Sequence, residues 1–311
     1  MLFECIQVSI ELYILGSSSA TPTKDRHPSA QVLKIGSEKI LIDCGEGTQS
    51  QLMKFGIKQA NLNTICISHL HGDHYFGLIG LLSTMSLYGR TQAMTIIGPP
   101  MLKDIIDIQL TASGMALNFE LIHIETTMDK HHTVYQTAAF SIQSFPLQHR
   151  IHCTGFLIQE SPKERHLNTA AIEQYQIPVA AYKAIKAGQD YNGPDGQTIP
   201  NAVLTTAAAS PCSYAYCSDT IFDPQIVPFI QGAHTLYHEA TYTNEHADRA
   251  ELYFHSTAEG AATIAQMAEV KQLIIGHYSS RYGQLDGLLK EAAAVFSPVD
   301  LAIEGKTYTI G

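Results

Sequence analysis

The sequence lacks any apolar run close to the roughly 18 residues that a membrane-spanning helix needs, although 45% of its 311 residues are hydrophobic. This share of hydrophobic residues is typical of a globular protein with a substantial core. Residues 1–14 include Glu4 and Glu11 and no basic residue, so they do not have the pattern of a secretory signal peptide. We therefore expect a cytoplasmic protein with no membrane segment.

Cysteine pairs at metal-binding spacing are also missing. The six cysteines form no Cys-x-x-Cys pair, and most lie in apolar, strand-like surroundings such as residues 64–67. This pattern favours buried, reduced thiols over a disulfide framework or a zinc–thiolate site. The cysteines are Cys5, Cys44, Cys66, Cys153, Cys212 and Cys217.

Positive charge is scarce, because 19 Lys and Arg residues face 29 Asp and Glu residues and leave a net charge of −10. Nucleic-acid backbones are bound through local cations. The composition therefore excludes a generally basic nucleic-acid binder, and any surface that meets RNA must be a local patch.

Strands alternate with helices over most of the chain, which predicts an α/β protein, either one large domain or two. The expected strands are residues 10–15, 30–35, 39–42, 64–68, 140–145, 153–158, 213–217, 235–238 and 272–275. The expected helices are residues 47–55, 77–87, 100–112, 257–270 and 284–294.

The stretch from about residue 160 to 210 breaks this rhythm, since it is polar or rich in alanine and contains several prolines and glycines. About 50 residues are few for an independent core. We interpret the stretch as an arm inserted into a single domain of residues 1–311; a flexible connecting loop is the alternative.

Histidine is unusually frequent, with fifteen copies, and four potential metal ligands fall within the six residues from His69 to His74. His69 and His71 alternate at the end of an expected strand, so both can face one metal ion. Gly72 permits a sharp turn that brings Asp73 and His74 toward a second ion. This clustering is the strongest functional signal in the sequence.

Three further expected strands end on residues of the same kind: His149, Asp219 and His277. Each alone could be a capping or surface residue, but strand ends at one sheet edge commonly assemble a site. We predict that His149 joins His69 and His71 on one ion, and that His277 joins Asp73 and His74 on the other. Asp219 would bridge the two.

Such nitrogen and oxygen ligands suit catalytic Zn²⁺, with Mn²⁺ or Fe²⁺ as alternatives. Two bound ions would favour attack by water on a phosphoryl group, because they lower the pKa of water and stabilise developing charge. Asp73 is the best candidate to accept the proton of that water. Asp43 is expected to contact a ligand histidine, although an ordinary turn aspartate is the alternative.

Nearly the whole chain resembles the ribonuclease Z family of the metallo-β-lactamase superfamily. The His69–His74 core indicates only the superfamily, whereas the flanking segments are much more specific. The segments that carry the resemblance are Asp43-Cys44-Gly45-Glu46-Gly47-Thr48-Gln49, His238-Glu239-Ala240-Thr241, His255-Ser256-Thr257 and His277-Tyr278-Ser279-Ser280-Arg281-Tyr282.

This resemblance implies an αβ/βα sandwich of two mixed β-sheets flanked by helices, two Zn²⁺ ions per subunit and a homodimer. It implies cleavage of precursor tRNA after the discriminator nucleotide, leaving a 3′-hydroxyl on the tRNA. It further implies that His255 donates a proton to the leaving 3′-oxygen, with Glu239 holding His255 in position. From the residues alone, His255 could equally be an ordinary residue at a helix start.

Substrate contacts follow from the same resemblance. Lys24 and Arg26 lie in a segment similar to a family motif for substrate recognition, although His27 stands where the family usually has asparagine; a charged surface turn is the alternative. Arg281 is a further expected RNA contact. The inserted arm stands where the family has its tRNA-binding arm, but its basic and acidic residues balance, so its shape matters more than its charge.

Three other functions compete with this interpretation. A broader phosphodiesterase or 3′-exoribonuclease of the same superfamily is the main alternative. A catalytically silent RNA-binding homologue would lack a ligand, and none is missing. A lactamase or thioesterase is disfavoured because the segments after the histidine core do not fit, although fold alone does not determine function.

Overall fold

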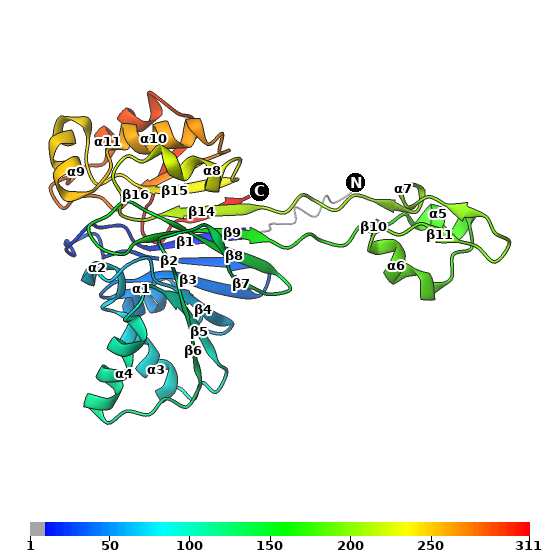
Figure 1. Cartoon of the computed structure of the whole chain (residues 1–311), viewed down its shortest axis with the longest axis horizontal. Coiled ribbons are helices and arrows are strands. Elements are labelled where there is room, and N and C mark those ends of the chain that lie inside the picture. The colour runs from blue at the N-terminus through cyan, green and yellow to red at the C-terminus, as the bar shows by residue number, and fades with distance from the viewer. Residues whose placement is uncertain (1–9) are drawn as a thin grey trace. The chain divides into compact units, whose positions relative to one another are not determined.

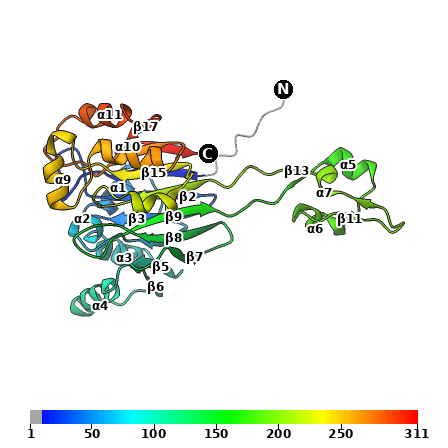
Figure 2. The ribbon, with the colours of Figure 1, turned by 45° about the horizontal axis from the view of Figure 1, so that its top comes forward.

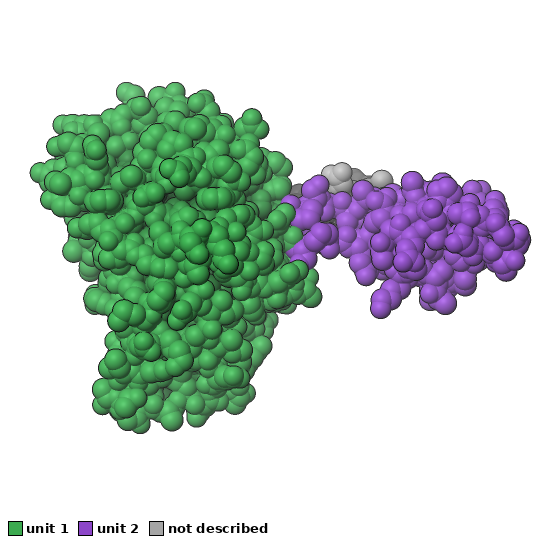
Figure 3. Space-filling view, in the orientation of Figure 1, with its two compact units in different colours: residues 1–160, 212–311 green, residues 161–211 purple. Residues whose placement is uncertain are grey.

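The computed structural model describes residues 10–311, which form two compact units (Figure 3). Unit 1 comprises residues up to Glu160 together with Cys212–Gly311, and unit 2 is Ser161–Pro211. The predicted arm of about residues 160–210 corresponds to unit 2. Over residues 10–311, no helix has the length and apolar character needed to cross a membrane. The expectations for residues 1–9, including Cys5, concern a part of the chain outside the described residues.

Unit 1 is built on two seven-stranded mixed sheets. The first has the order β18 (Thr307–Ile310), β1 (Ile10–Gly16), β2 (Ala30–Ile35), β3 (Glu38–Cys44), β4 (Leu62–Cys66), β5 (Met94–Gly98) and β6 (Leu121–Glu125). The second has the order β17 (Val299–Leu301), β16 (Leu273–Gly276), β15 (Thr235–Glu239), β14 (Ser213–Cys217), β9 (Thr154–Glu160), β8 (Phe140–Pro146) and β7 (His132–Gln136). Strands β3 to β6 and β14 to β17 pair in parallel, and the other pairs are antiparallel.

Helices cover the outer face of each sheet (Figures 1 and 2). The first sheet carries α1 (Thr48–Lys54), α2 (Gly72–Tyr75), α3 (Leu78–Leu87) and α4 (Leu102–Ser113). The second carries α8 (Val227–Ile230), α9 (Ala247–Tyr253), α10 (Ala258–Met267) and α11 (Asp286–Ala293). Short 3-10 helices lie at Pro224–Ile226 and Asn244–His246 in unit 1, and another lies at Val179–Ala181 in unit 2.

The alternation of side chains along each strand produces the layers. In β1, Ile10, Leu12 and Ile14 pack in the core between the two sheets, whereas Leu15 packs under the helices of the first sheet. The central core also contains Phe156 from the second sheet, so the sheets face each other. The structure therefore confirms the αβ/βα sandwich of two mixed sheets.

The cysteine side chains lie in the same apolar layers. Cys44, Cys66, Cys153 and Cys217 are free and buried in these cores, and Cys212 is buried as well. Burial raises the pKa of Cys44 to about 12. Cys44, Cys66, Cys153 and Cys217 therefore agree with the expectation of buried, reduced thiols.

Unit 2 has a small core of its own. Its elements are β10 (His166–Leu167), α5 (Thr169–Gln174), α6 (Tyr182–Lys186), β11 (Tyr191–Asn192), β12 (Thr198–Ile199), α7 (Asn201–Leu204) and β13 (Thr205–Thr206). Ile172, Ile185 and Leu204 are buried together. The amide of Asn201 donates to the carbonyl oxygens of Ile185 (2.6 Å) and Gln189 (2.9 Å), which joins α6 to α7.

Candidate metal centre

The segment His69–His74 follows β4 and runs into α2, and the three other expected ligands follow strands of the second sheet. His149 follows β8, Asp219 follows β14 and His277 follows β16 directly. The turn after β3 lies tightly against this segment, because a Cβ atom on Gly45 would come within 2.5 Å of the carbonyl oxygen of Asp73. The strand ends of both sheets therefore meet at one place, and all seven predicted ligands lie there.

The first group consists of His69, His71, His149 and Asp219. Nδ1 of His71 lies 3.1 Å from Nε2 of His69 and 3.1 Å from Nε2 of His149. Oδ2 of Asp219 lies 3.6 Å from Nε2 of His69 and 3.8 Å from Nε2 of His149. Burial lowers the pKa of all three histidines, which favours neutral imidazoles with a lone pair available.

The second group consists of Asp73, His74 and His277. The Nε2 atoms of His74 and His277 lie 3.2 Å apart, and Oδ2 of Asp73 lies 3.5 Å and 3.4 Å from them. Oδ1 of Asp219 faces this group, at 3.5 Å from His74 and 3.2 Å from His277. Asp219 thus turns one carboxylate oxygen toward each group.

These residues fit divalent metal ions. Oδ1 of Asp219 is buried and accepts no hydrogen bond from the described residues, and leaving such an oxygen unpaired is costly. Burial opposes protonation of His74, but Asp219, Asp73 and Asp43 outweigh burial and hold its pKa well above the usual range. The second group therefore favours positive charge, and its nitrogen and carboxylate ligands are those of a divalent transition metal.

Outer hydrogen bonds orient the imidazoles. Nδ1 of His74 lies 2.7 Å from Oδ2 of Asp43, as expected for Asp43, and the hydroxyl of Tyr216 donates to the same oxygen at 2.6 Å. Nδ1 of His149 donates to the carbonyl oxygen of Phe254 at 2.9 Å. These partners leave Nε2 of His74 and Nε2 of His149 to face the metal positions.

Asp73 has a partner that the sequence did not indicate. The backbone N–H of Ala20, in the loop after β1, donates to Oδ2 of Asp73 at 2.7 Å. Ala20 has a φ of 59°, in the left-handed region. A loop 53 residues away therefore fixes this carboxylate, and a local motif cannot reveal that contact.

His255 and Glu239 form a pair beside the metal groups. Nδ1 of His255 lies 2.9 Å from Oε1 of Glu239, which is fully buried at the end of β15. Burial lowers the pKa of His255, but Glu239 and Asp219 outweigh burial and raise it to about 9. Because Glu239 engages Nδ1, Nε2 is the nitrogen left for a substrate.

Thr241 links this pair to the second metal group, and sequence reasoning gave it no role. Its hydroxyl lies 2.7 Å from Oε2 of Glu239 and 2.9 Å from Nδ1 of His277. The hydroxyl can accept from His277 and donate to Glu239 at the same time. Thr241 therefore positions both the imidazole of His277 and the carboxylate that holds His255.

We expect Thr241→Val to lower metal affinity or cleavage rate by about 10- to 100-fold, as is usual when such an outer partner is lost. Thr241→Ser, which keeps the hydroxyl, should stay close to the parent protein. Zinc affinity by competition with a chromophoric chelator and the cleavage rate together measure the effect. A valine variant with unchanged affinity and rate would show that the hydroxyl has no positioning role.

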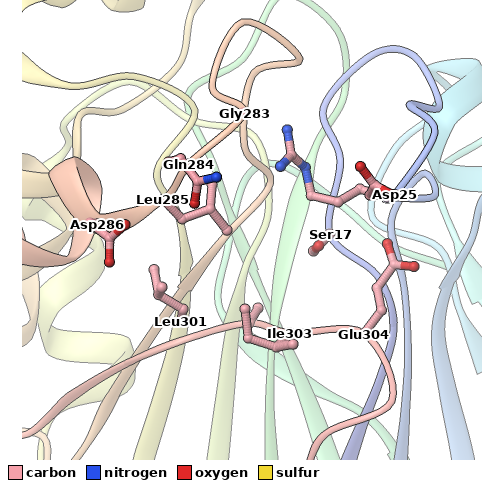
Figure 4. Close-up of a pocket in the computed structure, with 11 residues that line it drawn as sticks. Ser17, Asp25, Gly283, Gln284, Leu285, Asp286, Leu301, Ile303 and Glu304 are labelled. Atoms are coloured by element: carbon pink, nitrogen blue, oxygen red, sulfur yellow. The ribbon is translucent and has the colours of Figure 1, made fainter.

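The three expected substrate contacts have different surroundings. Nη2 of Arg26 donates to the carbonyl oxygen of Tyr282 at 2.7 Å, and its side chain lines a cavity of about 340 Å³. Figure 4 shows Asp25 and Glu304 on one side of this cavity. Lys24 is exposed, and the guanidinium of Arg281 lies over the ring of Tyr242, 5.3 Å from its centroid.

Comparison with known proteins adds to this geometry. A family model described as anti-Pycsar protein Apyc1 matches residues 10–173. That range ends before Asp219, Glu239, His255 and His277, so it covers only part of the centre.

Other relatives match nearly the full length. Ribonuclease Z of Porphyromonas gingivalis is 45% identical over 95% of this chain and 97% of its own, and that of Parabacteroides distasonis is 43% identical over 96% and 99%. The crystal structure of the short form of human tRNase Z has a TM-score of 0.70 at 28% identity, over 97% of this chain and 99% of that one. The chain belongs to the ribonuclease Z family, within the metallo-β-lactamase fold.

Proposed function

We propose that this protein is a metal-dependent endoribonuclease that removes the 3′ trailer from precursor tRNA and leaves a 3′-hydroxyl on the tRNA. The observation that carries the proposal is the arrangement of two groups of metal-binding side chains that share Asp219, beside the His255–Glu239 pair. Relatives named ribonuclease Z across the full chain favour this activity over a broader phosphodiesterase or 3′-exoribonuclease.

We propose two Zn²⁺ ions per chain, with Mn²⁺ or Fe²⁺ as substitutes. His69, His71 and His149 would hold one ion, Asp73, His74 and His277 the other, and Asp219 would contact both. When bound, such ions lower the pKa of water and stabilise charge on a phosphoryl group.

The protein's own residues would then move two protons. Asp73 would accept a proton from the attacking water, since its carboxylate is kept ionised: burial favours the neutral acid, but His74 and His277 hold its pKa well below the usual range. His255 would give a proton from Nε2 to the leaving 3′-oxygen, and Glu239 would stabilise the charged imidazole. Asp73 would therefore assist the attack by water, and His255 would assist the departure of the 3′-oxygen.

We further propose that the protein acts in the cytoplasm as a homodimer and that unit 2 is a substrate arm inserted into one metallo-β-lactamase-type domain. The core of unit 2, with Ile172, Ile185 and Leu204, is separate from the cores of unit 1. Lys24, Arg26 and Arg281 are proposed RNA contacts. Sedimentation of the purified protein would test the dimer.

The test of the activity uses a 3′-extended tRNA precursor and the protein loaded with Zn²⁺ or Mn²⁺. We expect one cut after the discriminator nucleotide, loss of cleavage on chelation and recovery when metal is restored. A metal-loaded protein that leaves the precursor intact would refute the proposal.

Deleting unit 2 tests the arm separately. We expect a variant in which a short Gly-Ser linker replaces residues 161–211 to lose cleavage of folded precursor but to keep turnover of bis(p-nitrophenyl) phosphate. The small ester reports an intact centre, because it is too small to need the arm. Equal loss with both substrates would instead indicate damage to unit 1, and unchanged precursor cleavage would contradict an arm that binds tRNA.

A further inference from the structure

A cleft of about 520 Å³ opens directly onto the metal centre. Its lining includes His71, Asp73, Asp219 and His255, which the proposed function already uses, and also Phe76 and Arg150, which it does not. An aromatic ring and a guanidinium are the two side chains that most often hold a single-stranded nucleotide. The cleft therefore offers more than the reacting groups alone.

Phe76 is exposed for 62% of its surface, although it lies only two residues after the buried ligand His74. The ring rests on Gly72, where an added Cβ atom would lie 2.3 Å from a ring carbon. Tyr75 meets the ring at 5.0 Å between centroids with a 66° interplanar angle. The ring is thus held from the protein side and still presents apolar surface to the cleft, as a stacking platform requires.

Arg150 follows His149 directly and is exposed. Within residues 10–311, its guanidinium forms no hydrogen bond or ion pair, whereas the acidic side chains Asp73, Asp219 and Glu46 line the same cleft. A guanidinium without a protein carboxylate partner can bind a phosphate through two parallel N–H groups. Arg150 is therefore available for the substrate backbone.

The position of Phe76 indicates which nucleotide it would contact. It lies on Gly72, in the same turn as Asp73, the proposed acceptor of the water proton. His255, the proposed donor to the leaving 3′-oxygen of the tRNA, lies in the loop between α9 and α10 and pairs with Glu239 at the end of β15 in the second sheet. The tRNA end belongs on the side of His255, so the side of Phe76 is left for the trailer.

We infer that Phe76 stacks on the base of the first trailer nucleotide and that Arg150 binds a backbone phosphate beside it. This inference rests on the proposed function and gives it a substrate subsite. Phe76 and Arg150 are substrate-binding residues in this account, and neither holds metal nor moves a proton.

Phe76→Ala is the first test, measured by single-turnover cleavage of a 3′-extended precursor. We expect kcat/KM to fall about 5- to 150-fold, the range that one base–aromatic stack supports. Phe76→Trp should keep the activity, because the stacking surface remains. Tyr88→Ala, which removes another exposed aromatic outside the cleft, is the matched control and should have no effect.

The deciding comparison uses precursors with an abasic site. With the first trailer nucleotide abasic, Phe76→Ala and the parent protein should cleave equally, because no base is left to stack. An equal penalty on abasic and normal trailers would overturn the inference, and so would a penalty that vanishes only when the discriminator is abasic. On the normal precursor, equal and efficient cleavage by the parent protein and by Phe76→Ala would refute the subsite alone. No cleavage of that precursor by the metal-loaded parent would refute the proposed function as well.

Arg150→Ala tests the phosphate contact through the salt dependence of precursor binding. We expect weaker binding and a slope of log K against log salt that is smaller by about one, as for one lost phosphate contact. Arg150→Lys should keep the slope. Metal content must equal that of the parent; an unchanged slope in a fully metal-loaded Arg150→Ala protein would overturn the role of Arg150.

Discussion

Asp73→Ala is expected to lower the rate of precursor cleavage by roughly 10³-fold or more and to weaken one of two bound metal ions. The size of the loss follows from two roles in one residue, since Asp73 would both contact an ion and accept the proton of the attacking water. Its Oδ2 lies 3.5 Å from Nε2 of His74 and 3.4 Å from Nε2 of His277. Single-turnover rates and metal content of the same sample measure both effects.

Asp73→Asn is the matched control for shape. The amide keeps the N–H contact from Ala20, seen at 2.7 Å in the native protein, but it carries no charge and accepts no proton. We expect the asparagine variant to remain folded and to cleave almost as poorly as the alanine variant. A near-normal rate in either variant would contradict the assignment of Asp73.

His255→Ala is expected to lower the cleavage rate by about 10²- to 10⁴-fold, the usual contribution of a general acid, while both metal ions stay bound. Nδ1 of His255 is engaged by Glu239, so the side chain is arranged to serve the substrate with Nε2. His131→Ala, at an exposed histidine before β7, is the control and should leave the rate unchanged.

Metal content decides between two roles for His255. The side chain also lies close enough to Asp219 and His277 to form a possible third ligand group with them. Loss of an ion from His255→Ala would therefore identify it as a ligand and contradict its role as proton donor. Retention of both ions with a reduced rate would support the donor role.

The fold was predictable where the signal is local. β2 and β14 have the predicted bounds, and β16, α3 and α10 lie within a few residues of theirs, because each carries a buried apolar pattern between clear breaks. The edge strands β6 and β7 were not predicted. Both are only half buried, so their sequences lack the clean alternation of a strand with one covered face.

The candidate site likewise has residues that the sequence predicts and contacts that it does not. Four of its residues fall within the six positions from His69 to His74, and His149, Asp219 and His277 could be added because strand ends meet at one edge. The contact of Ala20 with Asp73, the link through Thr241 and the exposure of Phe76 depend on how distant loops meet. The spacing of residues in the sequence does not predict such contacts, so they become visible only in the structure.

The most direct test of this account is to determine the structure of the zinc-loaded protein by diffraction at the zinc absorption edge. We expect two anomalous peaks per chain, one among His69, His71 and His149 and the other among Asp73, His74 and His277, with Asp219 between them. A single peak, or peaks elsewhere while the protein cleaves precursor tRNA, would contradict it.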